Sequence, residues 1–507
     1  MWRWIFRTVL IAACMGCSFP AVADDIAPLA QLQQRVFDVA EQTSPAVVSI
    51  ALVVLEKEDS LPPGFDPFNA VVNPGESGPV AEGFGSGVVL RADDSQDLLV
   101  LTNHHVITSQ IGFDDTIQQK IFVRTVGGHT LEAVVHAFDP RSDLAVLRCR
   151  LNGLTAETLK IQPPTFREEP TYRKGEFVLV LGNPLAIARD GNCSVAWGMI
   201  SNISRRPAGE IEDTMNSAAT IHQLDTLLQI DARLPLGMSG GAVLDLDGHL
   251  IGLTTSLAAG VGDANPAGFA IPLDAGMQRV VETLLKGEEV EYGFLGIDPE
   301  DSTVEDLRLA RPFVTQATCV HVSRVATRSP AALCDLREGD LVYKVNGTEA
   351  HDRSDLIRLL GLLGPEAEAR LSVYRPSTRQ FLTRTAILGK WPMYDDRRLV
   401  VTNQKYANWR GLRVDYATGR FRYLPDGFLS TYPQGVIVTT VSANSAAAQA
   451  DIGPGTRITE IAGKEVFTPH EFYAAIDGAN GPVELLFANG ERRVVPEPGI
   501  EDASQSE

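Results

Sequence analysis

The sequence predicts a mainly β chain, in which a β barrel or sandwich is followed by two copies of a small α+β module. Residues 45–272 contain many short runs of Val, Ile and Leu separated by Gly, Asn, Asp and Pro, which is typical of all-β domains. Helical periodicity is scarce in the same region. The second half of the chain contains an internal repeat. The length of 507 residues leaves room for about three or four domains.

Nine short apolar runs mark the expected strands of the β region. Each is bounded by turn residues, as the strands of an antiparallel barrel or sandwich are. After the first run, the stretch from Glu56 to Glu82 is rich in Pro, Gly and acidic residues, which predicts a long surface loop. The runs are Ala46–Leu55, Gly87–Leu90, Leu98–Thr102, Ala133–Val135, Leu144–Arg148, Phe177–Leu181, Leu227–Ile230, Gly241–Leu244 and Leu250–Thr254.

The second half of the chain repeats itself at a spacing of 116 residues. Cys319–Gly347 aligns with Gly435–Gly463 without a gap, and nine of these 29 positions are identical. Each copy contains a strand, an Ala-rich helical turn, a glycine and a second strand, and a helix with matching apolar positions follows. Two copies of one module are therefore expected over residues 290–390 (the first module) and 400–498 (the second module), before an acidic tail at 499–507.

The charge of the chain excludes several classes of partner. The sequence holds 44 Lys and Arg against 64 Asp and Glu, a formal net charge of −20. An acidic surface repels phosphate, so neither nucleic acid nor an anionic lipid surface is an expected partner. Hydrophobic residues make up 44% of the chain, which is enough for a core in each domain.

The N-terminus has the three regions of a secretory signal. Arg3 and Arg7 form a short basic region, an apolar stretch follows from about residue 8 to 19, and Ala21-Val22-Ala23 makes an A-x-A cleavage site. The sequence predicts a signal peptide over residues 1–23, cleaved after Ala23. The mature chain would then be periplasmic or secreted, with no integral membrane segment.

Two alternatives to a cleaved signal are left open. The first is a retained N-terminal anchor, although the apolar run is shorter than the ~20 residues that span a bilayer. The second is lipid attachment at Cys14, because Ile11-Ala12-Ala13-Cys14 is similar to a lipobox. The apolar region before that cysteine is short for a lipoprotein signal.

The mature chain keeps four cysteines. In an oxidising compartment they can pair, and the alternative is that all four are small core hydrophobes. Their spacing contains no C-x₂-C, so no metal site is expected, and no other cofactor is predicted. The four are Cys149, Cys193, Cys319 and Cys334.

A serine among glycines is the most informative motif of the β region. In Gly237-x-Ser239-Gly240-Gly241 the backbone has unusual freedom and a substrate can come close. The N–H groups of Gly237 and Ser239 can converge on one point and stabilise an oxyanion. The motif predicts an acyl-transfer nucleophile. The alternative is a tight turn between strands with an incidental serine.

A nucleophilic serine needs a base, and the base needs an orienting acid. His105 follows an expected strand, where an imidazole can be held rigidly near neutral pH. Asp143 begins an apolar strand, so it is expected to be partly buried and to need a partner. Asp139, before Pro140, is expected to be a turn residue. His105, Asp143 and Ser239 thus form a candidate catalytic set.

These segments together resemble the HtrA/Deg family of trypsin-like serine proteases. Members are secreted or periplasmic enzymes that join a chymotrypsin-like double β-barrel protease domain to one or two PDZ domains. The resemblance implies that residues 24–285 form the protease domain and that both modules are PDZ domains. It rests on Ser44–Ile50, Gly85–Val88, Thr102–Val106, Asp143–Leu147, Leu181–Pro184, the serine segment, Asp247–Gly252 and Gly268–Pro272.

The resemblance also implies an activity. The enzyme would be a serine endopeptidase that cleaves unfolded or damaged proteins through an acyl-enzyme, and it would assemble as a homotrimer or a larger oligomer. His105 is similar to the base, Asp143 to the orienting acid and Ser239 to the nucleophile, with Gly237 and Ser239 lining the oxyanion hole. An alternative of another class is an inactive chaperone or scaffold that binds unfolded proteins.

Two further sites follow from the resemblance. Arg233 stands where a protease that cleaves after Lys or Arg has an acid, so an apolar substrate pocket is expected. In the first module a carboxylate-binding loop would capture C-terminal peptides. The expected pocket walls are Ile251, Phe269, Ala270 and Ile271, and the expected loop is Phe294, Leu295, Gly296 and Ile297.

Three positions depart from the family pattern. Met238 replaces the Asn that usually precedes the serine, and His104 replaces an Asn before the histidine. Only the backbone is needed at Met238, so activity is expected to survive. In the second module Arg410 stands where an apolar residue is usual, which leaves a packing role as the alternative to peptide binding.

Overall fold

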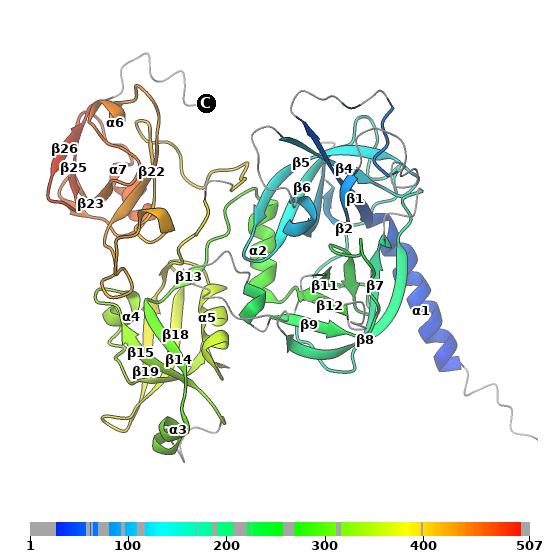
Figure 1. Cartoon of the computed structure of the whole chain (residues 1–507), viewed down its shortest axis with the longest axis horizontal. Coiled ribbons are helices and arrows are strands. Elements are labelled where there is room, and N and C mark those ends of the chain that lie inside the picture. Colours follow the sequence, from blue (N-terminus) through cyan, green and yellow to red (C-terminus); the bar gives the residue numbers. More distant parts are fainter. Residues whose placement is uncertain are drawn as a thin grey trace, which may run out of the picture.

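Two closed β barrels and two smaller sheet modules make up the molecule (Figure 1). The predicted signal peptide and the acidic tail lie outside the described residues. The computed structural model describes residues 27–56, 61, 64–68, 81–92, 97–108, 117–168, 170–184, 190–205, 221–224, 226–256, 268–310, 316–396 and 399–497.

The first barrel is closed by six antiparallel strands in the order β1-β2-β3-β6-β5-β4. Its strands are rich in Val, Leu and Ile, and the side chains that face inward form an almost fully buried core. The strands are β1 (Val47–Glu56), β2 (Ala81–Ala92), β3 (Asp97–Asn103), β4 (Ile117–Arg124), β5 (Thr130–Asp139) and β6 (Leu144–Arg150).

The second barrel has the same strand number and the order β10-β11-β12-β9-β8-β7. Helix α1 (Ala27–Thr43) precedes the first barrel, and helix α2 (Ala275–Leu285), capped by the Asp274 carboxylate, follows the second. The strands are β7 (Phe177–Gly182), β8 (Ser194–Arg205), β9 (Leu227–Ile230), β10 (Ala242–Leu244), β11 (Leu250–Thr255) and β12 (Gly268–Pro272). The predicted mainly β class, with a chymotrypsin-like double barrel, is confirmed.

The first module is built around one antiparallel sheet in the order β14-β15-β16-β18-β19, with β17 paired to β16. A separate two-stranded sheet pairs β13 with β20. Its elements are β13 (Gly293–Phe294), β14 (Ile297–Asp301), α3 (Val304–Ala310), β15 (Val320–Val325), α4 (Pro330–Leu333), β16 (Leu341–Val345), β17 (Thr348–Glu349), α5 (Arg353–Gly361), β18 (Glu368–Arg375), β19 (Gln380–Ile387) and β20 (Gly389–Lys390).

The second module repeats this strand order, β21-β22-β23-β25-β26 with β24 paired to β23. The internal repeat of the sequence therefore corresponds to a repeat of topology. Its elements are β21 (Leu412–Tyr416), β22 (Val436–Val441), α6 (Ala446–Gln449), β23 (Arg457–Ile461), β24 (Lys464–Glu465), α7 (Pro469–Ile476), β25 (Val483–Phe487) and β26 (Arg492–Val495).

The structure bears on the four cysteines and on the predicted loop Glu56–Glu82. All four cysteines of the described chain are unpaired, and Cys149 and Cys319 are fully buried, as small core residues are. Most of the predicted loop Glu56–Glu82 lies outside the described residues, but Phe68 is buried beneath the Arg124 guanidinium. In the part of the chain that the structure describes, no helix is long and apolar enough to span a membrane.

Candidate active site

The turn that carries Ser239 is fixed against the first barrel. The backbone N–H of Ser86 on β2 donates to the Ser239 carbonyl over 2.7 Å, and the Ser86 hydroxyl donates to the Gly237 carbonyl over 2.8 Å. Gly240 has φ +85°, and a Cβ there would lie 2.0 Å from the Ser86 carbonyl oxygen. Only glycine fits so close an approach. The glycines of the motif thus bring Ser239 to the junction of the two barrels.

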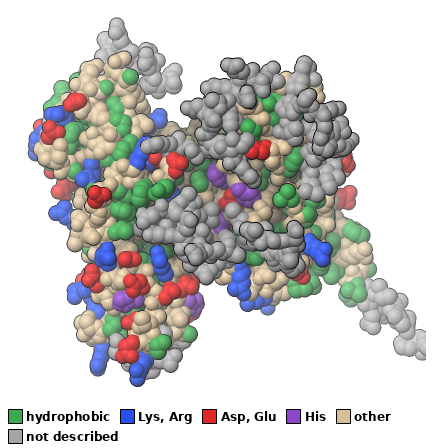
Figure 2. Space-filling view, viewed as in Figure 1, with side chains coloured by type: hydrophobic (Ala, Val, Ile, Leu, Met, Phe, Trp, Pro, Cys, Tyr) green, Lys and Arg blue, Asp and Glu red, His purple; other side chains and the backbone are tan. Residues whose placement is uncertain are grey.

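His105 and Asp143 form a closely bonded pair on the first barrel. His105 lies in a short 3₁₀ turn (His104–Ile107) after β3, and Asp143 precedes β6. The Nδ1 atom of His105 is 2.8 Å from Oδ2 of Asp143, and the His105 backbone N–H donates to Oδ1 over 2.9 Å. The Asp143 side chain is 3% exposed and that of His105 is 30% exposed. A buried carboxylate thus fixes an accessible imidazole. Figure 2 shows histidine side chains on the barrel part of the face that it draws.

Ser256 links the serine to the histidine. Its backbone N–H donates to Ser239 Oγ over 3.1 Å, and its hydroxyl lies 3.2 Å from His105 Nε2. Within the described residues, no hydrogen bond joins Ser239 Oγ directly to His105 Nε2. Sequence reasoning missed Ser256, which directly follows β11. Its placement comes from the pairing of β11 with β10, the strand next to the serine turn.

The turn that carries Asp143 is held from several sides. Asp139 accepts hydrogen bonds from the Ser142 backbone N–H over 2.9 Å and from the Tyr292 hydroxyl over 2.5 Å. Burial and the nearby Asp139 charge raise the pKa of Tyr292 well above its usual value, so its hydroxyl stays a donor. The His222 ring contacts the Ser142 carbonyl at 2.8 Å. These contacts hold Asp143 at φ 53°, a left-handed conformation that is costly for a residue with a side chain.

Two of the departures from the family pattern, Met238 and His104, make packing contacts of their own. Met238 is 3% exposed and packs in the core of the second barrel, close to Gly182. His104 stacks on Phe138 with ring centroids 4.6 Å apart, and its Nε2 lies 3.3 Å from Thr108 Oγ1. Neither side chain takes part in the contacts among Ser239, Ser256 and His105.

The expected substrate pocket has mixed structural support. Ile251 and Ala270 belong to the core of the second barrel, and Ile271 to the core between the barrels, all with 0% exposure. Phe269 is partly buried and Arg233 is exposed. A pocket walled by these four apolar residues stays a prediction.

Two buried histidines, His136 and His222, and the half-buried His104 predict a loss of stability in mild acid. Burial lowers the pKa values of His104, His136 and His222 below the ordinary value. Below about pH 6.5 these three histidines are therefore protonated more readily in the unfolded chain than in the folded chain. As a result, the free energy of unfolding decreases as the pH falls. We expect a lower melting temperature at about pH 5.5 than at about pH 7.5, a range in which ordinary carboxylates stay ionised.

Matched variants separate this effect from other acid effects. His222→Gln should reduce the dependence of the melting temperature on pH, whereas the same change at His129, an exposed histidine, should leave it unchanged. Equal melting temperatures of the parent protein at the two pH values would contradict the prediction.

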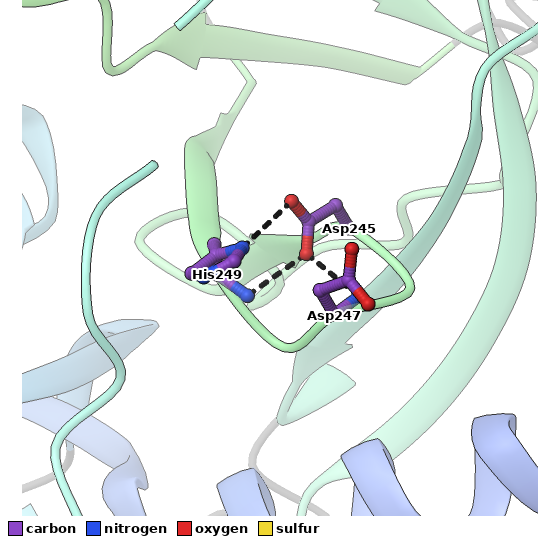
Figure 3. A group of neighbouring side chains, drawn as sticks. All are labelled: Asp245, Asp247 and His249. Carbon is purple, nitrogen blue, oxygen red and sulfur yellow. Dashed lines mark hydrogen bonds and ion pairs between the residues drawn. The ribbon is translucent and has the colours of Figure 1, made fainter. Parts of the chain in front are cut away.

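A cluster of Asp245, Asp247 and His249 in the loop between β10 and β11 is a structural clasp (Figure 3). Asp245 accepts hydrogen bonds from the backbone N–H groups of Asp247 and His249, both over 2.9 Å. Arg167 pairs with Asp245 at 3.0 Å, and Arg35 with Asp247 at 3.0 Å. Each of the two carboxylates thus has an arginine partner.

The expected carboxylate-binding loop lines an apolar groove in the first module. Phe294, Leu295, Gly296 and Ile297 border a cavity of about 420 Å³ between β14 and α5. Gly296 has φ +79°, and a Cβ there would lie 2.5 Å from Ser329 Cβ. In the second module the Arg410 guanidinium donates to backbone carbonyls, among them those of Gly481 over 2.7 Å and Val495 over 2.8 Å.

Comparison with known proteins follows this division of the chain. The family described as trypsin-like peptidase domain matches residues 85–253, and the family described as PDZ domain matches residues 321–375. A relative from Brucella suis biovar 1 (strain 1330), a probable periplasmic serine endoprotease DegP-like, is 28% identical over 411 residues, which cover 80% of this chain and 70% of the relative.

Another relative is the periplasmic pH-dependent serine endoprotease DegQ of Escherichia coli (strain K12). It is 26% identical over 372 residues, which cover 72% of this chain and 73% of the relative. A solved structure of the HtrA-type protease AlgW with decapeptide covers 70% of this chain and 99% of that chain, at 25% identity and a TM-score of 0.47.

The class of protein follows from the two barrels, the trypsin-like peptidase match and the DegP-like and DegQ relatives. The chain is a trypsin-like serine endopeptidase that carries a PDZ domain. It is similar to the DegP-like and DegQ endoproteases of bacteria. The PDZ match lies within the first module, so the prediction of two PDZ domains is confirmed for the first copy and stays a prediction for the second.

Proposed function

We propose that Ser239, His105 and Asp143 are the catalytic triad of this endopeptidase and that it cleaves unfolded or damaged proteins through an acyl-enzyme. The observation that carries the proposal is the 2.8 Å contact between His105 Nδ1 and Asp143 Oδ2, beside a serine that the glycine turn holds at the same junction. Asp143 keeps the Nδ1 proton in place, and Nε2 then accepts the proton of the attacking hydroxyl. The carboxylate also stabilises the imidazolium that forms.

Ser256 has a defined place in this reaction. Its hydroxyl now lies at His105 Nε2, the atom that must accept the Ser239 proton. Attack therefore requires the Ser239 hydroxyl to replace that of Ser256 at Nε2. The backbone N–H groups of Gly237 and Ser239 donate to no protein group among the described residues, which leaves them free to stabilise the developing oxyanion.

The first module would bind the C-terminus of a polypeptide in the groove beside Phe294–Ile297. The loop offers backbone N–H groups for a carboxylate, and the apolar cavity next to it fits a hydrophobic side chain. In the second module the bonded Arg410 favours packing over peptide binding. The periplasmic relatives support export of this chain. Signal cleavage after Ala23 and a homotrimeric assembly stay predictions.

A fluorophosphonate probe and unfolded casein test the triad. The purified protein should react covalently with the probe and cleave casein, because an activated serine attacks both. Ser239→Ala should lose labelling and lower kcat on the order of 10⁶-fold, the effect of removing a triad serine in a comparable enzyme. Ser323→Ala, which removes an exposed hydroxyl of the first module, is the matched control and should keep both activities.

The outcome also decides between the two function classes. Absence of labelling and cleavage in the native protein, with Ser239→Ala indistinguishable from it, would overturn the catalytic assignment. An inactive chaperone or scaffold that binds unfolded proteins would then be the better description.

A further inference from the structure

The apolar groove of the first module has a wall that comes from the second module. Leu356 and Leu360 of α5 form one side of the cavity of about 420 Å³. Trp391, which follows β20, and Leu429, from the segment between β21 and β22, complete its lining. Figure 2 shows hydrophobic side chains gathered on this face near the place where the two modules meet. The groove is therefore composite, although the sequence repeat places Leu429 in another module.

The segment that carries Leu429 is bonded to the first module by its backbone. The N–H of Thr327 donates to the Ser430 carbonyl over 2.9 Å, and the N–H of Tyr432 donates to the Thr327 carbonyl over 3.0 Å. Together they form a parallel bridge between Thr327 and Thr431. This bridge fixes Leu429 relative to the groove.

Tyr432 packs against the carboxylate-binding loop from the other side. Its ring is nearly parallel to that of Phe294, with an angle of 20° and centroids 6.2 Å apart. A Cβ on Gly389 would lie 1.9 Å from the Tyr432 hydroxyl oxygen, so glycine is needed there for the ring to fit. Burial raises the pKa of Tyr432 to about 12, which keeps the ring neutral in this contact.

We propose that Leu429 is a specificity-determining residue of the first module's peptide groove, because it sets the size of the C-terminal side chain that the groove accepts. The inference rests on the proposed peptide binding by the first module. The cavity falls within the range of about 300–1,000 Å³ typical of ligand sites, so it has room for a large side chain. Leu429 limits its size on the side of the second module. The second module would thus act on peptide choice through this contact.

Two peptides that differ only in their last residue test the assignment. Labelled decapeptides ending in Leu or Phe would be titrated into the full chain in a Ser239→Ala background, with fluorescence anisotropy as the readout. Leu429→Ala should enlarge the cavity and weaken the Leu-ending peptide about tenfold relative to the Phe-ending one, the scale on which apolar pockets discriminate side-chain size. Leu429→Trp should narrow the cavity and shift the ratio of the two affinities in the opposite direction, toward the Leu-ending peptide.

The controls separate the inference from the proposed function. Leu333→Ala removes the same side chain from a position of the first module that is 81% exposed, and should change neither affinity. If neither peptide binds the parent chain, peptide binding by the first module is refuted and the role of Leu429 with it. If both peptides bind, but the ratio of their affinities is the same in Leu429→Ala, Leu429→Trp and the parent, the assignment of Leu429 alone is refuted.

Discussion

Asp143→Asn should lower kcat by about 10⁴-fold while the protein keeps its fold, because the variant holds the histidine in the wrong tautomer. Both carboxylate oxygens are in use: Oδ1 accepts from the His105 backbone N–H, and Oδ2 faces Nδ1. An asparagine has one oxygen. If it stays on the backbone N–H, the amide NH₂ faces Nδ1 and the ring proton moves to Nε2. That nitrogen then cannot accept a proton from Ser239.

The measurement is kcat on casein or a short peptide, together with the melting temperature. Asp247→Asn makes the same chemical change on an aspartate whose side chain is 72% exposed, and should leave kcat unchanged. An Asp143→Asn protein that folds normally and turns over at the parent rate would show that Asp143 does not orient the base. A large fall in melting temperature, in contrast, would mean that the turn itself depends on the carboxylate.

The fold could be predicted from the sequence where burial imposes a pattern. Runs such as Leu98–Thr102 and Leu144–Arg148 lie in strands with both faces buried, so nearly every residue is apolar. Strand β8 was not predicted, because Val195, Trp197 and other apolar side chains of its outer face are exposed among polar neighbours. Helix α1 was not predicted either, since most of its residues are exposed and their hydrophobic periodicity is weak.

Only those residues of the candidate site that lie in a recognisable local sequence motif could be predicted. The glycines beside Ser239 and the strand before His105 can be seen in the sequence. Ser256 and Tyr292 have no such local pattern. Ser256 reaches the serine through strand pairing, and Tyr292 reaches Asp139 from the connection between the second barrel and the first module. Contacts of this kind depend on how distant elements pack.

The same limit applies to a cluster of buried charges between the two modules. Lys390 has a side chain that is 1% exposed, and its Nζ lies 2.7 Å from Glu289, 3.0 Å from Glu291 and 3.0 Å from Asp415. Arg420 adds contacts to Glu289 at 2.5 Å and to Asp415 at 2.7 Å. These residues are spread over more than a hundred positions of the chain. No local pattern marks them as partners.

The balance of charge in this cluster keeps it ionised. Burial alone would lower the pKa of Lys390, but the attraction of Asp415, Glu289 and Glu291 outweighs it and the pKa is raised. Burial alone would raise the pKa of Glu289, but Lys390 and Arg420 hold it at about 2. Glu289 therefore stabilises the folded state above its unfolded pKa of about 4.5. This contribution is lost as the pH falls from there toward 2.

Lys390→Met should destabilise the contact between the modules by about 3–5 kcal/mol, because it removes one cation of a buried ion cluster and leaves Glu289 and Asp415 to share the charge of Arg420. Denaturant unfolding and limited proteolysis between the modules measure the effect. Lys405→Met is the matched control: this lysine also pairs with Glu291, at 2.9 Å, but its side chain is 49% exposed, so about 1 kcal/mol or less is expected. Glu289→Gln should restore part of the stability of Lys390→Met, since it reduces the excess of negative charge around Arg420. Equal, small effects of the two lysine variants would mean that the buried cluster is not what fixes the second module to the first.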